Sequence, residues 1–212
     1  METGNYVDYI GFLKSKMVIA KKTGIAIDAG EISAVLKPHQ RDAVLWAAAG
    51  GRRAIFAAFG LGKTIMQLEW CRLIHEKKGG KMLIVCPLGV KQEFMRDAEA
   101  LLHMDTPVYV RNMEEVESAP GWLMITNYER VRDGDIRPDA FAGTSLDEAA
   151  VLRSFGSKTY QTFLNKFRGV PYKLVSTATP SPNKYKELIH YAGYLEIMDT
   201  GQALTRFFKR DS

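Results

Sequence analysis

Residues 53–68, RAIFAAFGLGKTIMQL, constrain the fold of this chain more than any other stretch. Residues 54–58 form a short apolar run of the kind found in buried strands. A loop with two glycines follows over residues 59–64, and a helical pattern begins at Ile65. Glycine permits backbone angles that other residues resist, so the chain can turn sharply here. The stretch therefore predicts a strand, a tight loop and a helix, the building unit of an α/β fold.

The loop has the residues that a phosphate-binding loop requires. Gly60 and Gly62 let the backbone approach an anion, which then faces the positive end of the following helix. Lys63 can reach terminal phosphate oxygens, and the Thr64 hydroxyl can ligate Mg²⁺. The general pattern GxxxxGK[ST] has a glycine where this chain has Ala57, so the strict pattern fails at one position. An ordinary glycine turn is the alternative, and Lys-Thr directly after Gly-Leu-Gly argues against it.

The composition is that of a globular protein with a hydrophobic core. The 212 residues suffice for one large domain or two small ones, and 46% of them are hydrophobic. A formal net charge of +5 is compatible with a nucleic-acid partner without requiring one. No apolar run reaches the ~18 residues of a membrane span, and charged residues interrupt the N-terminal segment, so neither a membrane partner nor a signal peptide is predicted. Cys71 and Cys86 lie in apolar patterns without a CxxC pair, which predicts reduced core residues in a cytosolic protein.

Apolar runs alternate with helical patterns along most of the chain. Further strands are expected at residues 82–86, 107–110, 122–126, 145–148 and 172–177, and further helices at residues 5–22, 38–49, 90–102, 157–167, 185–195 and 202–209. Residues 132–137 are expected to form a polar loop. This alternation predicts a mostly parallel sheet sandwiched by helices. We expect an N-terminal helical extension over residues 1–35 and one α/β domain over residues 36–212.

Two adjacent acids, Asp147 and Glu148, follow a short apolar lead-in. At a strand end, Asp147 would hold Mg²⁺ beside the phosphates, directly or through water. Glu148 would orient and deprotonate an attacking water. Adjacent acids are also common on solvated surfaces, and the lead-in over residues 143–146 is less apolar than usual. Their position well behind a phosphate loop favours the catalytic interpretation.

A run of small residues, Ser176-Thr177-Ala178-Thr179-Pro180, follows the apolar strand pattern. Hydroxyl residues at the carboxyl end of a parallel strand lie where ligands bind in such sheets. They could sense a γ-phosphate and pass its presence to another surface. A strand ended by a Thr-Pro turn is the alternative, and the run taken alone favours that simpler interpretation.

Together these motifs resemble those of the superfamily 2 helicases and translocases. Gly60-Leu61-Gly62-Lys63-Thr64, Asp147-Glu148 and Thr177-Ala178-Thr179-Pro180 occur in the order and rough spacing of that superfamily. The glycine loop, Cys86-Pro87-Leu88 and Ile125-Thr126-Asn127-Tyr128 are most similar to the Swi/Snf-like branch. Residues 146–161 and 177–188 are similar to helicase-like proteins of phages and prophages. The resemblance spans residues 36 to about 195 and implies a RecA-like P-loop NTPase lobe.

The resemblance implies ATP and Mg²⁺ as ligands and assigns roles to particular residues. Leu36-Lys37-Pro38-His39-Gln40 matches the Q motif, whose glutamine reads the adenine edge, and a glutamine can pair bidentately with adenine. The implied nucleotide-binding residues are Gln40, Phe59, Gly60, Leu61, Gly62, Lys63 and Thr64. Thr64 and Asp147 would bind the metal, Lys63 and Glu148 would be catalytic, and Thr177, Ala178 and Thr179 would couple nucleotide to DNA.

The implied macromolecular partner is DNA, duplex or single-stranded. Loops that follow strands are expected to hold its phosphates through backbone N–H groups, hydroxyls and basic side chains. The candidate residues are Pro87, Leu88, Lys91, Thr126, Asn127, Arg130, Arg153 and Lys158. For the four basic residues in this set, an ordinary solvated charge is an equally good interpretation.

Two departures from the family pattern bear on function. Ala150 stands where the family has His or Asp, and it has no polar group to couple hydrolysis to nucleic acid. The family's motor also has two RecA-like lobes with ATP between them, whereas only the first is recognised in these residues. We therefore expect a fragment of a longer motor, in a bacterial or phage-infected cytoplasm, that binds nucleotide weakly and hydrolyses it slowly. A natural one-lobe module that binds DNA or protein is the alternative, and a phosphotransferase is disfavoured by the motif order.

Overall fold

The computed structural model describes residues 20–149, 152 and 158–208. Within them, six strands form one sheet in the order β1-β6-β5-β2-β4-β3, and every neighbouring pair is parallel. The strands are β1 (Arg52–Phe56), β2 (Met82–Val85), β3 (Val108–Tyr109), β4 (Leu123–Thr126), β5 (Gly143–Asp147) and β6 (Tyr172–Thr177). The predicted parallel α/β sheet is confirmed.

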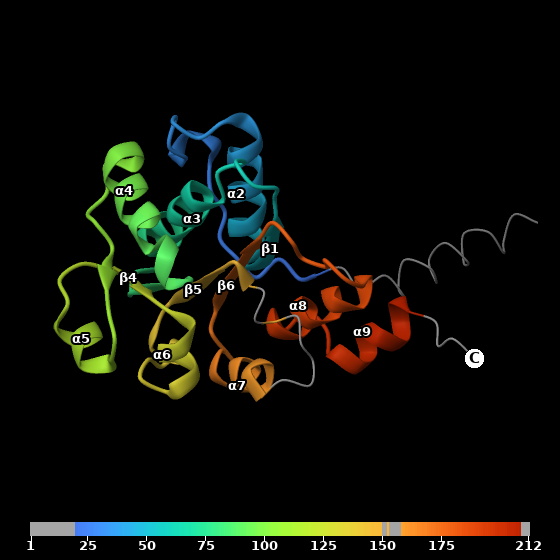
Figure 1. The fold of residues 1–212 in the computed structure, drawn as a ribbon. Helices are drawn as coiled ribbons and strands as arrows, with labels where there is room; N and C mark the ends of the chain where they lie inside the picture. Colours follow the sequence, from blue (N-terminus) through green and yellow to red (C-terminus); the bar gives the residue numbers. More distant parts are fainter. Residues whose placement is uncertain (1–19, 150–151, 153–157, 209–212) are drawn as a thin grey trace, which may run out of the picture.

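Helices cover both faces of the sheet (Figure 1). One face packs against α2 (Pro38–Gly50), α3 (Lys63–Lys78) and α4 (Lys91–Leu102). The other packs against α5 (Met113–Ser118), α6 (Tyr128–Asp133), α7 (Lys158–Lys166) and α8 (Leu188–Tyr194). Helix α9 (Thr200–Phe207) lies against α8, and short 3-10 turns occupy Ala29–Glu31, Leu88–Val90, Pro138–Ala140 and Tyr185–Glu187. The chain thus forms three layers, with the sheet in the middle.

Three of the central strands, β2, β4 and β6, contribute to both hydrophobic cores. In β2, Met82 and Ile84 belong to the core under α2, α3 and α4, whereas Leu83 and Val85 belong to the core on the other face. All four side chains are fully buried, which explains why this strand is a continuous apolar run. Burying each of them contributes roughly 1.5–3 kcal/mol. The sheet is therefore held from both sides.

Two boundaries at the glycine loop differ from the sequence expectation. Strand β1 spans Arg52–Phe56 rather than residues 54–58, because the chain leaves the sheet after the Ala57 N–H bonds to Thr177. Helix α3 begins at Lys63 rather than Ile65, because the preceding glycine occupies the N-cap position in a left-handed conformation. The strand, loop and helix themselves are confirmed.

Two further predictions need correction, and one element is confirmed. The expected polar loop over residues 132–137 begins inside α6, which ends only where Gly134 takes a φ of 97°. The expected helix over residues 185–195 is divided into a 3-10 turn and α8. Strand β5 forms in spite of its weakly apolar lead-in, because it is paired on both sides and its first four residues are buried.

The N-terminal extension is described only from residue 20 onward. The expected helix over residues 5–22 lies largely outside the described residues, and residues 20–28 contain no helix. Ile25, Ile32 and Leu36 are buried in the core that α2 and α3 share. This part of the extension therefore packs on the α/β domain, while a boundary at residues 35 and 36 stays a prediction.

Both cysteines are core residues, as expected. Cys71 and Cys86 are free thiols and are buried. Burial, assisted by the charge of Asp147, raises the pKa of Cys86 to about 12. Neither thiol is therefore a reactive thiolate near neutral pH. No helix among the described residues is long and apolar enough to cross a membrane.

A buried lysine joins β6 to the chain that follows α8. Lys173 is 1% exposed, and its Nζ donates hydrogen bonds to the Tyr194 carbonyl and to Glu196 Oε1, each at 3.1 Å. Glu196 also accepts hydrogen bonds from Arg52 and, at 2.8 Å, from the Gly169 N–H. Burial lowers the pKa of Lys173 to about 8, although the Glu196 carboxylate opposes the shift. This network fixes the amino ends of β1 and β6.

We expect Lys173→Met to remove one source of pH-dependent stability. At low pH the lysine is protonated in the folded and unfolded chain alike. Between about pH 8 and pH 10.5 the folded chain gives up this proton while the unfolded chain keeps it. The free energy of unfolding of the native chain should therefore rise, relative to the variant, by roughly 2–3 kcal/mol across this interval. Urea unfolding of both proteins across this pH range measures the difference between their free energies of unfolding. If that difference does not change with pH, the pKa of Lys173 is not lowered in the folded chain.

Candidate functional site

Three predicted motifs meet at one edge of the sheet because β6 lies between β1 and β5. Phe56 at the end of β1 pairs with Thr177, and Asp147 at the end of β5 pairs with Ser176. Neighbouring strands lie about 4.8 Å apart, so the three strand ends span roughly 10 Å. The glycine loop, the acidic pair and the hydroxyl run therefore share a single carboxyl edge, where ligands bind in such sheets.

The loop before α3 is shaped by two left-handed glycines. Gly60 and Gly62 both have a φ of 79°, a region that is costly for residues with a Cβ atom. A Cβ at Gly62 would lie 2.3 Å from Gln40 Nε2. At Gly60, by contrast, a Cβ would meet no atom of the described residues within 4 Å. The loop thus has one closely packed glycine and one whose backbone faces open space.

Lys63, the first residue of α3, folds back over the loop. Its Nζ donates hydrogen bonds to the carbonyls of Ala57 (3.1 Å) and Ala58 (3.3 Å). It also lies 5.0 Å from the ring centre of Phe59, which is 77% exposed. The first N–H groups of a helix lack helical partners, so they and the helix dipole favour an anion beside this ammonium group.

Gln40, buried on α2, supports the loop from the other side. Its Oε1 accepts a hydrogen bond from the Lys37 N–H at 2.8 Å, and its Nε2 donates to the Leu61 carbonyl at 3.0 Å. A side-chain amide has two N–H groups and two lone pairs on oxygen. Gln40 therefore retains one donor and one acceptor, the pair that recognition of an adenine edge uses.

The Asp147 carboxylate is connected to α3. Its Oδ1 accepts a hydrogen bond from Gln67 Nε2 at 2.8 Å, and Gln67 Oε1 accepts one from Ser145 Oγ at 2.7 Å. Burial raises the pKa of Asp147, against the lowering effect of the Gln67 hydrogen bond. A carboxylate has about four acceptor positions, so this bond leaves capacity for a cation.

A cation at Asp147 would need ligands other than a cluster of acidic, His or Cys side chains. Among the described residues, no cluster of three His, Cys, Asp or Glu side chains is arranged to hold a metal ion. Mg²⁺ commonly binds one or two protein oxygens and completes its shell with water and phosphate oxygens. Asp147 at the end of β5 and Thr64 in the first turn of α3 have oxygen atoms of the kind such a site uses.

Glu148 is held in a strained backbone conformation by the hydroxyl run. Its φ is 48°, which costs roughly 1–2 kcal/mol in a residue with a Cβ atom. Its Oε1 accepts hydrogen bonds from Thr177 Oγ1 (3.2 Å) and Thr179 Oγ1 (3.3 Å), and the Thr179 N–H donates to Thr177 Oγ1 at 3.1 Å. Ala178 connects the two threonines. Strain that the surroundings hold in place marks a candidate functional position.

Three residues at this edge were not selected from the sequence. Besides Gln67 and Ser145, Tyr128 contributes its hydroxyl, which donates to the Asp147 carbonyl at 2.6 Å. Burial raises the pKa of Tyr128 well above its usual value, so the hydroxyl stays a donor. Gln67 has a usable signal in the sequence, because it lies four residues after Lys63 and hence on the same helical face. Tyr128 belongs to the family-like motif of residues 125–128, but nothing in that motif indicates its contact with Asp147.

The candidate DNA contacts follow β2 and β4 at the same edge. Leu88 is 52% exposed, next to the partly buried Pro87. Lys91 Nζ lies 4.4 Å from the ring centre of Tyr109. Asn127 Nδ2 donates to Glu129 Oε2 at 2.7 Å, and Arg130 pairs with Asp135 at 2.9 Å.

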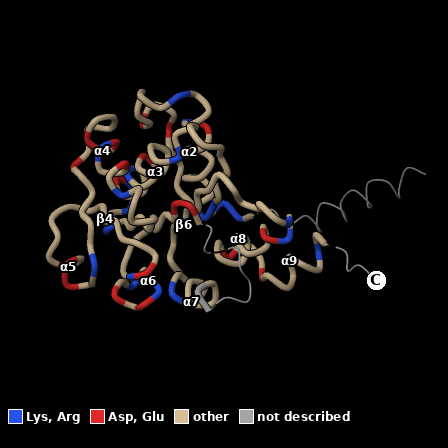
Figure 2. Tube along the Cα trace, in the orientation of Figure 1, with Lys and Arg blue, Asp and Glu red and all other residues tan. Residues whose placement is uncertain are grey.

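One candidate is not available as a surface contact. Thr126 is fully buried, and its hydroxyl donates to the Val110 carbonyl at 2.8 Å, so we remove its side chain from the candidate DNA surface. Arg153, Ala150 and the side chain of Lys158 lie outside the described residues. Lys and Arg are interspersed with Asp and Glu along α4 and α6 (Figure 2), so the surface beside these loops has mixed charge.

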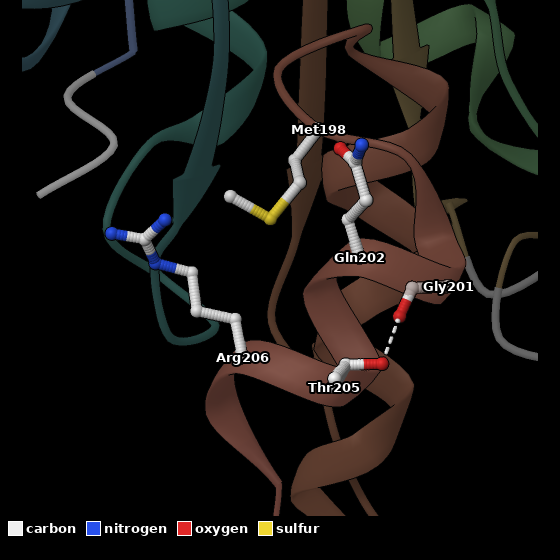
Figure 3. A pocket seen from close by; sticks show the side chains of 5 residues that line it. All are labelled: Met198, Gly201, Gln202, Thr205 and Arg206. Atoms are coloured by element: carbon white, nitrogen blue, oxygen red, sulfur yellow. Dashed lines mark hydrogen bonds between the residues drawn. The ribbon is translucent and has the colours of Figure 1, made fainter. Parts of the chain in front are cut away.

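A hollow of about 650 Å³ lies beside α9, and no residue of the glycine loop lines it (Figure 3). Its lining side chains come from α9 and the residue preceding its cap, and they are Met198, Gly201, Gln202, Thr205 and Arg206. The Thr205 hydroxyl donates to the Gly201 carbonyl at 3.0 Å, within the helix. None of these residues is a predicted site residue, and we assign the hollow no part in the site.

Comparisons with known proteins agree with this arrangement. Residues 39–203 match the model of a family described as the SNF2-related domain. The fold is similar to that of the Sulfolobus solfataricus SWI2/SNF2 ATPase core in complex with dsDNA, with a TM-score of 0.69 and 17% identity over 86% of this chain and 41% of that one. It is also similar to the UvsW helicase of bacteriophage T4, with a TM-score of 0.62 and 16% identity over 91% and 66%. A search of curated proteins found no match. The chain thus spans less than half of the Sulfolobus core and about two thirds of the phage helicase.

We expect Gly62→Ala to destabilise the domain more than Gly60→Ala. Both alanines would adopt a left-handed φ, which costs roughly 1–2 kcal/mol. Only the alanine at position 62 also meets Gln40 Nε2, at 2.3 Å, and displaces it from the Leu61 carbonyl. Loss of that hydrogen bond adds about 1 kcal/mol. Urea unfolding of the two variants measures the difference, and equal losses of stability would show that Gln40 does not brace the loop.

Proposed function

This chain belongs to the SNF2-related family of helicase-like ATPase domains, and we propose that it is the ATP-binding lobe of a motor that couples Mg·ATP hydrolysis to movement on DNA. The observation that carries this proposal is the convergence of Lys63, Asp147 and Glu148 at one sheet edge, with β6 between the strands that supply them. A phosphate loop, a metal-binding acid and a general base are the groups that phosphoryl transfer to water requires.

In this proposal, the glycine loop and the start of α3 bind the phosphates. Lys63 exchanges its bonds to the Ala57 and Ala58 carbonyls for terminal phosphate oxygens, which form stronger charge-assisted hydrogen bonds. Thr64 and Asp147 would hold Mg²⁺, which neutralises charge on the β- and γ-phosphates when bound. Gln40 reads the adenine edge, and Phe59 and Leu61 contact the nucleotide from the exposed tip of the loop.

Glu148 acts on the attacking water. Its carboxylate takes a proton from the water as the oxygen attacks the γ-phosphorus and the bond to the departing ADP breaks. The hydroxyls of Thr177 and Thr179 hold this carboxylate through hydrogen bonds to Oε1. A change at the γ-phosphate would therefore reach the end of β6 through Glu148.

The proposed partner is DNA, contacted by the segments that follow β2 and β4, which include the starts of α4 and α6. The fold is similar to that of a SWI2/SNF2 core in complex with dsDNA, which supports this choice. The contacting residues would be Pro87, Leu88, Lys91, Asn127 and Arg130. We further propose that a second RecA-like lobe supplies arginines to the transferring phosphoryl group, a contribution worth ~10³–10⁵ in rate. The chain alone should then hydrolyse ATP slowly.

A nucleotide-dependent binding module without motor activity is the second candidate function. Ala150, in place of the polar residue that couples hydrolysis to nucleic acid in the family, favours this candidate. The intact set of Lys63, Asp147 and Glu148 favours the motor. DNA distinguishes the two, because only a motor's hydrolysis rises when DNA is added.

We expect Lys63→Ala to weaken Mg·ATP binding roughly 10- to 100-fold, because it removes a charged hydrogen bond worth about 1.5–3 kcal/mol. Isothermal titration calorimetry on both proteins measures the change. Lys78→Ala is the matched control, since Lys78 is exposed at the opposite end of α3 and should bind ATP as the native chain does.

Phosphate release in the same samples, with and without duplex DNA, completes this experiment. Binding that depends on Lys63, together with little turnover, would support a site that needs a second lobe. Brisk DNA-stimulated turnover by this chain alone would contradict the proposed requirement for that lobe. Absence of binding by the native chain would overturn the nucleotide site.

We expect Lys91→Ala and Arg130→Ala each to weaken duplex DNA binding and to reduce the slope of log K against log salt by about 1, because each removes one phosphate contact. Fluorescence anisotropy at several salt concentrations measures the slope. Lys78→Ala again serves as a control, because it lies at the other edge of the sheet. If neither variant changes the slope, the DNA does not contact Lys91 or Arg130.

A further inference from the structure

We propose that Gln67 is a positioning residue that orients the Asp147 carboxylate for Mg²⁺. The inference rests on the proposed function, because it takes Asp147 as a ligand of the metal. It adds to that function a residue outside the glycine loop, the acidic pair and the hydroxyl run. It also identifies α3 as the element that sets the geometry of the metal site.

Gln67 is a polar residue in an apolar position. It is 0% exposed, and its neighbours Met66 and Leu68 are buried in the core. An amide buried without hydrogen bonds is costly, and an apolar side chain of similar size would fill the same space. Both ends of the Gln67 amide are bonded, at 2.8 Å to Asp147 Oδ1 and at 2.7 Å to Ser145 Oγ. We therefore attribute the amide of Gln67 to these two hydrogen bonds, because packing of the core alone does not require it.

The chemistry of the three groups determines the direction of the amide. A carboxylate only accepts hydrogen bonds, so the NH₂ group of Gln67 must face Asp147. The carbonyl oxygen then faces Ser145, which is itself fully buried and donates its hydroxyl hydrogen. A flipped amide would bring two oxygens together at Asp147. Ser145 thus fixes Gln67, and Gln67 fixes the carboxylate.

The main chain of Asp147 is held separately. Its carbonyl accepts the Tyr128 hydroxyl at 2.6 Å, and its register in β5 is set by pairing with Ser176. The remaining freedom of Asp147 lies in the rotation of its side chain. The hydrogen bond from Gln67 restrains that rotation.

Gln67 lies on the same helix as the other proposed metal ligand. It follows Thr64 by three residues and Lys63 by four, so all three lie on neighbouring positions of one face of α3. The relative placement of Thr64 and Asp147 is therefore set by a rigid helix rather than by the loop. Mg²⁺ requires a nearly ideal octahedron at 2.0–2.1 Å, whereas Ca²⁺ accepts flexible geometry. A misoriented carboxylate should consequently harm Mg²⁺ binding more than Ca²⁺ binding.

The test is a titration of Mg²⁺ into the chain with a fluorescent ATP analogue, on the native protein and on Gln67→Met. Met has a similar volume but makes neither hydrogen bond. We expect the Mg²⁺ concentration at half-saturation to rise roughly 10- to 100-fold, as is typical when a partner that orients a metal ligand is lost. With Ca²⁺ the rise should be several-fold smaller, and binding of the analogue in EDTA should change little. Met66→Leu, a change at the adjacent buried residue, should leave all three quantities as they are.

Two further variants separate the possible outcomes. Ser145→Ala keeps Gln67 but frees its amide, so it should shift the Mg²⁺ dependence in the same direction. Ser145→Ala also replaces Gln67→Met in this test if Gln67→Met does not fold.

Asp147→Asn should abolish the Mg²⁺ response. If it does so while Gln67→Met and Ser145→Ala respond like the native chain, the inference is overturned and the proposed function stands. If the native chain shows no Mg²⁺ response, the metal site and the inference fall together. Equal losses with Mg²⁺ and Ca²⁺ would mean that Gln67 has only a structural role.

Discussion

The pairing of β6 between β1 and β5 is the constraint on which the site depends. Parallel pairing brings the carboxyl ends of all three strands to one edge, and the register Phe56 to Thr177 and Asp147 to Ser176 aligns them closely. Residues some eighty positions apart in the chain, such as Gln67 and Asp147, can then form a direct hydrogen bond. A slip of one residue in β6 would turn its side chains to the opposite face and separate the hydroxyl run from Glu148.

Several polar side chains at this edge hydrogen-bond to one another. Gln67 bonds to Ser145 and Asp147, and Glu148 accepts from Thr177 at the end of β6 and from Thr179 after it. A buried polar group without a hydrogen-bond partner destabilises the fold. These hydrogen bonds therefore offset the cost of burying the groups that make them. The amino ends of β1 and β6 are secured in the same way through Lys173 and Glu196. The sheet edge that carries the site is thus supported by a second polar network at the far end of the same strands.

The sequence predicts the elements better than it predicts their contacts. The glycine loop, the acidic pair and the alternation of strands and helices are local patterns, and the structure contains each of these elements. The short helix α6 is missed because its six residues are largely polar and follow the strand without a proline or glycine. Gln67 and Tyr128 are missed for another reason. Their partners lie on β5, and strand order, which brings them together, is not encoded in any local periodicity.

Tyr128 shows how the two halves of the sheet edge are physically joined. It belongs to the segment that follows β4, beside Asn127 and Arg130, and its hydroxyl reaches the Asp147 carbonyl on β5. Strand β2 lies between β4 and β5, so this bond crosses over the end of an intervening strand. Its ring packs against Phe163 of α7, which limits the movement of the ring. Tyr128, the first residue of α6, thus links the segment after β4 to the main chain of Asp147, the residue whose side chain Gln67 holds.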